Sequence, residues 1–114
     1  MTFATGAYWA FTHGMWAFGV STPGELIAAG RHYTLQGLAE RITCPTLVCE
    51  AENDPFWQGQ PRQLFDALTC ERAYLCFTTE EGAGEHCHAG AHTLFHQRMF
   101  DWLDDAVGHR GAVA

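Results

Sequence analysis

The pattern of hydrophobic and polar positions changes near residue 42. Residues 46–51 (TLVCEA) form a short, nearly continuous apolar run, which is typical of a strand that is covered on both faces. A second short apolar run covers residues 73–77, and the amphipathic segment 61–68 between the two runs predicts a helix. A helix between two strands is typical of the right-handed crossover that joins parallel strands, so the pattern predicts two adjacent parallel strands with the helix crossing between them.

A last helix is predicted over residues 91–107. Its hydrophobic positions recur at the i, i+4, i+7 spacing of one helix face, which predicts a stripe buried against the sheet. The residues of this stripe are Phe95, Met99, Trp102, Leu103 and Ala106. Gly108 is expected to end the helix, and residues 109–114 are expected to form a frayed tail.

Residues 1–32 are aromatic and rich in Gly, and a series of short helices is predicted along the chain up to residue 41. Large apolar side chains between residues 8 and 18 fit a helix with a broad apolar face. Thr22 has the position of a helix N-cap, with Pro next and Glu three residues later, so a helix is predicted over residues 23–30. A further short helix is expected over residues 35–41.

The composition excludes several classes of protein. Apolar residues make up 47 % of the 114-residue chain and charged residues 17 %, which excludes a disordered chain. The 13 acidic and 6 basic residues give a net charge of −7, so we expect neither a nucleic acid nor an anionic membrane as a partner. No membrane span or secretory signal is expected. The five cysteines show no C-x-x-C spacing and predict reduced thiols in a cytoplasmic protein.

Two polar segments follow the two predicted strands, and each carries a residue suited to acid–base chemistry. Asp54 follows the first strand and His86 follows the second, so parallel strands would bring both to one edge of the sheet. A carboxylate bonded to one ring nitrogen fixes the tautomer of a histidine, and the other nitrogen can then take a proton from a nucleophile. Glu52 and His88 are the alternatives for these two positions, because they lie in the same segments.

Three stretches of this sequence resemble consecutive parts of an α/β-hydrolase. Residues 44–54 (CPTLVCEAEND) resemble the penultimate strand and its acid turn, and residues 80–87 (EEGAGEHC) resemble the histidine loop. Residues 95–103 (FHQRMFDWL) resemble the closing helix. Within that superfamily the chain is most similar to the dipeptidyl aminopeptidase/acylaminoacyl-peptidase-like group, and residues 16–41 resemble the helical cap segment of that group.

The resemblance implies a partial α/β-hydrolase fold, with a helical cap-like segment over residues 1–41 and the C-terminal part of the core over residues 42–108. It implies that Asp54 is the acid and His86 the base of a Ser-His-Asp triad. The implied reaction is hydrolysis of an ester, amide or C–C bond in a small-molecule substrate. The resemblance implies neither a cofactor nor a metal.

The nucleophile of that triad has no counterpart in the sequence. In α/β-hydrolases the Ser lies on a G-x-S-x-G elbow, and this motif does not occur here. Ser21, the single serine, is flanked by Val20 and Thr22. We therefore expect a truncated gene product, a fragment or a chain that a partner completes, and we expect the chain to be inactive alone.

Two functions of other classes also fit the sequence. A non-catalytic chain would self-associate as a homo-oligomer, because two short strands leave unpaired edges that have to be covered. A His-rich metal-binding module is the other alternative, since His88, His92 and His96 recur at a spacing of four residues.

Overall fold

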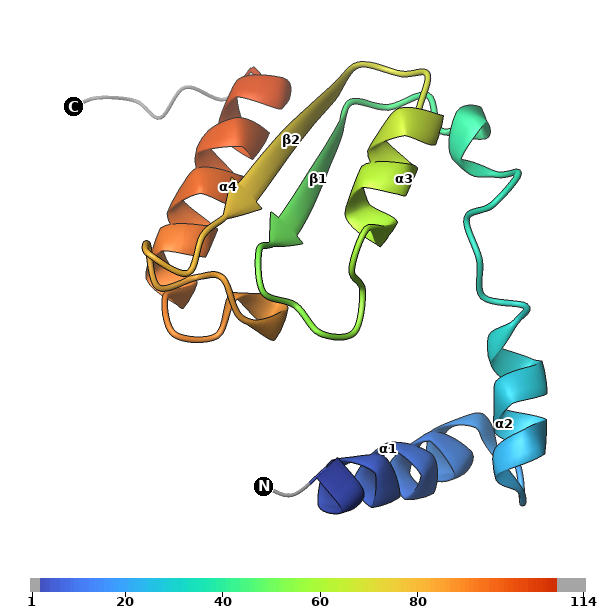
Figure 1. Cartoon of the computed structure of the whole chain (residues 1–114). Helices are drawn as coiled ribbons and strands as arrows, with labels where there is room; N and C mark the ends of the chain where they lie inside the picture. The colour runs from blue at the N-terminus through green and yellow to red at the C-terminus, as the bar shows by residue number, and fades with distance from the viewer. Residues whose placement is uncertain (1–2, 109–114) are drawn as a thin grey trace. The chain divides into compact units, whose positions relative to one another are not determined.

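The computed structural model describes residues 3–108, which form two compact units, one within Met1–Gln36 and one within Gly37–Ala114. Figure 1 shows two α-helices in the first unit, and two strands and two α-helices in the second. The frayed tail expected at residues 109–114 lies outside the described residues. The domain boundary expected between residues 41 and 42 stays a prediction.

The second unit is built on two parallel strands. Strand β1 (Thr46–Ala51) pairs with strand β2 (Arg72–Phe77), and the pairing begins with Thr46 beside Arg72 and ends with Ala51 beside Phe77. Helix α3 (Gln60–Ala67) connects the two strands, and helix α4 (His92–Ala106) follows β2 (Figure 1). The predicted pair of parallel strands is confirmed, and the unit is compatible with a partial α/β fold.

Helices α3 and α4 cover opposite faces of the sheet. Phe65 of α3 contacts Tyr74 with a distance of 5.3 Å between ring centroids, and Phe95 of α4 contacts Phe77 at 5.4 Å. Tyr74 and Phe77 are three residues apart on β2, and side chains alternate between the faces of a strand. The core is small, and Phe77 and Leu68 are its largest fully buried side chains.

The predicted buried stripe on the last helix is only partly correct. Phe95, Met99 and Trp102 are half-buried, but Leu103 is 40 % exposed and Ala106 is also exposed. A sheet of two strands is narrow, and within residues 37–108 the final turns of α4 stay exposed. Leu103 and Ala106 therefore have the spacing of a buried stripe, but they are not buried.

The first unit consists of helix α1 (Phe3–Phe18) and helix α2 (Pro23–Gly30). The predicted start of α2 is confirmed: Thr22 Oγ1 accepts a hydrogen bond from Glu25 N–H at 3.2 Å, and a Glu25 carboxylate oxygen accepts one from Thr22 N–H at 3.0 Å. The two helices approach closely at Gly14, where a Cβ atom would lie 2.7 Å from a methyl carbon of Leu26.

The helix predicted over residues 35–41 is wrong for its first half. Only Ala39–Arg41 is helical, as a single 3₁₀ turn within the second unit. The reason is Gly37, whose φ of +75° lies in the left-handed region and interrupts a right-handed helix. Ala39 itself is buried and packs with Val48 and Leu68 in the core of the second unit.

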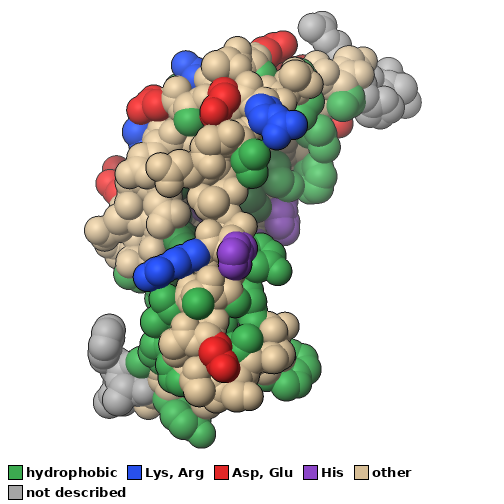
Figure 2. All heavy atoms as spheres, turned by 90° about the vertical axis from the view of Figure 1, so that its right-hand side faces the viewer, with side chains coloured by type: hydrophobic (Ala, Val, Ile, Leu, Met, Phe, Trp, Pro, Cys, Tyr) green, Lys and Arg blue, Asp and Glu red, His purple; other side chains and the backbone are tan. Residues whose placement is uncertain are grey.

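Large apolar side chains are exposed over much of the first unit. Figure 2 shows them gathered on its surface, where Tyr8, Trp9, Trp16 and Tyr33 are each more than 60 % exposed. Several aromatic side chains of this unit are thus accessible to solvent. None of the helices within residues 3–108 is both long enough and apolar enough to cross a membrane.

Candidate active site

The two parallel strands deliver two loops to one edge of the sheet, and hydrogen bonds tie these loops together. The acid turn (residues 52–56) follows β1, and the histidine loop (residues 78–90) follows β2. Asn53 makes two of the connections: its backbone N–H donates to Gly84 O at 2.8 Å, and its side-chain amide donates to Glu85 Oε1 at 3.1 Å. The loops are therefore held in a fixed register beyond the carboxyl ends of the strands, where α/β sheets place their sites.

Asp54 and His86 meet across these two loops. Asp54 Oδ2 lies 2.9 Å from His86 Nδ1, although 32 residues separate the two in the sequence. The other carboxylate oxygen of Asp54 accepts a hydrogen bond from Phe56 N–H at 2.8 Å, and the Phe56 ring packs edge-on against the His86 ring. The side chain of Asp54 is 15 % exposed and that of His86 is 41 % exposed. This distance is that of an ordinary hydrogen bond between a carboxylate and an imidazole.

The environment of Asp54 keeps it ionised. Desolvation raises the pKa of this carboxyl, but the hydrogen bonds from His86 and from the backbone N–H of Phe56 outweigh that effect, so the pKa lies below the ordinary value. A carboxylate acceptor requires the proton of His86 to be on Nδ1, which leaves Nε2 as the ring's free acceptor. The arrangement can therefore supply a base held in one tautomer.

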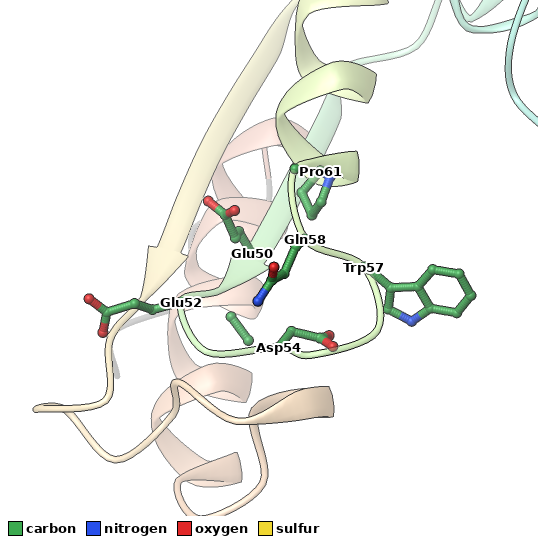
Figure 3. A pocket seen from close by; sticks show the side chains of 8 residues that line it. Glu50, Glu52, Asp54, Trp57, Gln58 and Pro61 are labelled. Carbon is green, nitrogen blue, oxygen red and sulfur yellow. The ribbon is translucent and has the colours of Figure 1, made fainter. Parts of the chain in front are cut away.

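The alternative residues Glu52 and His88 do not form this pair. Glu52 Oε2 accepts a hydrogen bond from Thr79 N–H at 2.8 Å, and in Figure 3 the side chains of Glu52 and Asp54 extend to opposite sides of the turn. His88 is buried, and its Nδ1 lies 3.2 Å from Ala83 O. Burial lowers the pKa of His88 below its usual value, outweighing the opposite effect of the bond to Ala83.

A cavity of about 170 Å³ lies beside the acid turn (Figure 3). Its lining includes three carboxylates and an aromatic ring, from Glu50, Glu52, Asp54 and Trp57. The three carboxylates already have partners, because Glu50 accepts a hydrogen bond from the Tyr74 hydroxyl and the other two are bonded as described above. Burial and the Glu50 carboxylate raise the pKa of Tyr74 to about 12, so this hydroxyl stays a donor.

The predicted histidine cluster does not form a metal site. Within residues 3–108 no three or more His, Cys, Asp or Glu side chains are grouped so that they could hold a metal ion. The rings of His92 and His96 stack with centroids 6.0 Å apart on α4, but His88 is buried between aromatic rings. His92 Nε2 instead contacts Cys87 O at 3.1 Å.

Ser21 takes part in the start of α2. Its backbone N–H donates to Glu25 Oε2 at 2.8 Å, and it belongs to the first compact unit. Sequence reasoning named Asp54 and His86 as the candidates, with Glu52 and His88 as alternatives, and it missed the connections through Asn53 and the burial of His88. No hydrophobic period or short motif marks these contacts, because they join residues of different loops.

Comparison with known proteins finds relatives that are named hydrolases. The chain is 32 % identical over 109 residues to hydrolase LUC6 of a Fusarium species, covering 90 % of this chain and 26 % of that protein. It is 32 % identical over 103 residues to 20-hydroxy-prefusarin hydrolase FUS2 of Gibberella moniliformis, covering 84 % of this chain and 25 % of that protein. It is 30 % identical over 122 residues to alpha/beta hydrolase psoB of Aspergillus fumigatus, covering 90 % of this chain and 26 % of that protein.

The chain spans about a quarter of the length of these curated relatives. No protein-family model matches it, and no solved structure matches it. None of these three relatives is named a peptidase, so the expected peptidase-like subgroup stays a prediction. The named relatives support an α/β-hydrolase-type family for this chain.

Proposed function

We propose that this chain provides the acid and the base of a hydrolase active site that cleaves an ester, amide or C–C bond. The observation that carries the proposal is the 2.9 Å contact between Asp54 Oδ2 and His86 Nδ1 at the carboxyl ends of two parallel strands. The hydrolase names of the relatives agree with this chemistry. The peptidase-like subgroup, the cytoplasmic location and a small-molecule substrate belong to the same proposal.

In the proposed reaction Asp54 orients His86 and stabilises its protonated form. A hydroxyl from outside these 114 residues attacks the carbonyl carbon of the substrate, and its proton passes to His86 Nε2. The imidazolium then gives that proton to the leaving group as the carbonyl re-forms. Water attacks the acyl intermediate in the second half, again losing its proton to His86, and the regenerated hydroxyl recovers that proton.

The experiment replaces the matching quarter of the Fusarium hydrolase by this chain and measures hydrolysis of an activated ester. We expect an active chimera in which Asp54→Asn lowers the turnover roughly 10⁴-fold, the size of effect known for loss of the orienting carboxylate in a triad. His86→Ala should lower it at least as much, because no other ring nitrogen takes its place. The isolated chain should show no burst of covalent intermediate.

The control variants remove the same groups elsewhere. Asp66→Asn on α3 and His96→Ala on α4 change exposed side chains that lie outside the pair, so the activity of the chimera should be unchanged. An active chimera that keeps its full turnover after both Asp54→Asn and His86→Ala would show that these residues are not the acid and the base.

The exposed aromatic surface of the first unit favours a second candidate function. Contiguous apolar surface on a water-soluble protein commonly marks an association site. We propose as this alternative a non-catalytic chain that self-associates through α1 and α2, and the Discussion gives its test.

A further inference from the structure

We infer that His88 is a positioning residue, whose buried ring holds the turn that presents His86 to Asp54. The inference rests on the proposed function, because it assigns His88 to the support of the base in that same site. From the sequence, His88 was an alternative to His86 as the base. The inference gives His88 a different role.

The turn after His86 has an unusual backbone. Cys87 and His88 both have a φ of +57°, and they are the only residues other than Gly with positive φ within residues 3–108. Two consecutive left-handed residues with side chains are conformationally unfavourable, and they persist only where surrounding contacts hold them. Of the two side chains, that of Cys87 is exposed, so His88 supplies the buried side-chain contacts of this turn, while the Cys87 carbonyl is contacted by His92 Nε2 at 3.1 Å.

The ring of His88 is fixed on three sides. It stacks on the Phe95 ring with centroids 4.2 Å apart and planes 17° apart, and it contacts the Phe77 ring at 4.6 Å. Its Nδ1–H donates to the carbonyl of Ala83, a residue with no exposed surface, at 3.2 Å. The residue as a whole is 8 % exposed. These contacts join the histidine loop to the end of β2 and to α4.

The fixed ring determines where His86 lies. The backbone N–H of His88 donates to Glu85 O at 2.8 Å, and that of Ala89 donates to His86 O at 3.3 Å, so the turn is closed on both sides of His86. The ring of His86 itself has its contacts in the acid turn, with Asp54 and Phe56. The side chain of His86 has only this hydrogen bond and this edge contact and is 41 % exposed, so its position depends on the backbone of the turn that carries it.

The test compares His88→Gly and His88→Asn with the unchanged 114-residue chain. Gly and Asn both tolerate positive φ, so these variants remove the ring and keep a residue suited to the backbone. The readout is the tautomer of each neutral imidazole, measured at pH 8 by long-range ¹H–¹⁵N correlation on the ¹⁵N-labelled chain. His96, which is exposed on α4, serves as the internal reference, and His96→Phe is the matched control.

In the unchanged chain we expect His86 to be protonated on Nδ1, and we expect Asp54→Asn to reduce that population. In both His88 variants the Nδ1–H population of His86 should fall by at least half toward that of His96, while His96→Phe leaves it unchanged. The amide signals of β1 and β2 report whether the sheet is intact.

Three results would overturn the inference, and they differ in what else they affect. His88 variants with an intact sheet and the original His86 tautomer would remove the positioning role and leave the proposed function standing. Loss of the sheet in both variants would make His88 a residue of general stability. If Asp54→Asn left the tautomer of His86 as it is in the unchanged chain, that result would contradict the acid–base pair, and with it the proposed function.

Discussion

Gly84 is a single residue on which the geometry of the histidine loop depends. It is buried, and a Cβ atom at this position would lie 2.5 Å from the backbone nitrogen of Thr79 and 2.8 Å from its Cα. Gly84 also accepts the backbone hydrogen bond from Asn53 that joins the loop to the acid turn. The close approach therefore requires a residue without a side chain, for a reason that has nothing to do with its φ angle.

Gly84→Ala should lower the free energy of unfolding by about 1–3 kcal/mol, the usual cost of forcing an extra carbon into a packed site. The clash involves backbone atoms, which cannot move aside as a flexible side chain would. Urea unfolding followed by the near-ultraviolet signal measures the effect. Glu80→Ala, at an exposed position of the same loop, is the control and should change the stability little. Equal stability of both variants would contradict the close packing.

At the scale of the elements, an ion pair joins α4 to the histidine loop. Arg98 donates to a carboxylate oxygen of Glu81, and its guanidinium carbon lies 5.5 Å from the centre of the Phe77 ring. The other carboxylate oxygen of Glu81 accepts a hydrogen bond from Thr78 N–H at 3.2 Å. Bonds from Arg98 and from the backbone of Thr78 lower the pKa of Glu81 to about 2. The position of α4 is thus linked to a loop carboxylate as well as to the stacked aromatic rings.

Because of this ion pair, we expect part of the free energy of unfolding to depend on pH in the acid range. The folded pKa of Glu81 lies below the unfolded value of 4.5, so its contribution is present above pH 4.5 and is lost as the pH falls toward 2. Arg98→Gln should remove part of this dependence, so the stability of the variant should fall less steeply over that pH range. Urea unfolding at a series of pH values gives the slopes, with Asp104→Asn as the exposed control on α4. Parallel slopes for wild type and Arg98→Gln would contradict the assignment.

At the scale of the whole molecule, the buried core is small compared with the apolar surface that stays exposed. Six hydrophobic residues are buried among the described ones, whereas fourteen large hydrophobic side chains are exposed. Trp16 is 79 % exposed and Trp9 is 63 % exposed, both on α1. The outer edges of the two strands are also unpaired within residues 3–108. Apolar surface and free strand edges both favour association with other protein surface.

If the chain self-associates through α1 and α2, sedimentation velocity of the purified chain should show a dimer or larger species in the micromolar range. The double variant Trp9→Glu/Trp16→Glu should shift the population toward monomer, because it places two charges on that surface. Gln97→Glu, which adds one charge at an exposed position of α4, is the control and should keep the wild-type distribution. The highest concentration tested is about 50 µM, which lies in the range where weak dimers form. A wild-type chain that stays monomeric there would remove the second candidate function.

The sequence by itself determined most of the elements and limited the pair to two carboxylates and two histidines. The apolar run 46–51 reproduces β1, and the capping pattern after Thr22 reproduces the start of α2, since strand burial and helix capping are local properties. Asp54 and His86 were candidates for the pair, with Glu52 and His88 as alternatives, because parallel strands place their carboxyl ends at one edge of the sheet. Local patterns failed at residues 35–38, where the left-handed Gly37 is incompatible with a right-handed helix. They also failed at Leu103 and Ala106, whose burial depends on a neighbouring layer.

Only the tertiary structure decided which carboxylate and which histidine meet. Glu52 and Asp54 lie two residues apart, as do His86 and His88, so the sequence left alternatives open for both positions. In the folded chain Glu52 is bonded to Thr79 and His88 is buried between aromatic rings, which leaves Asp54 and His86 to pair. The selection depends on contacts between segments that are distant in the chain, and no periodicity or spacing within one segment encodes such contacts.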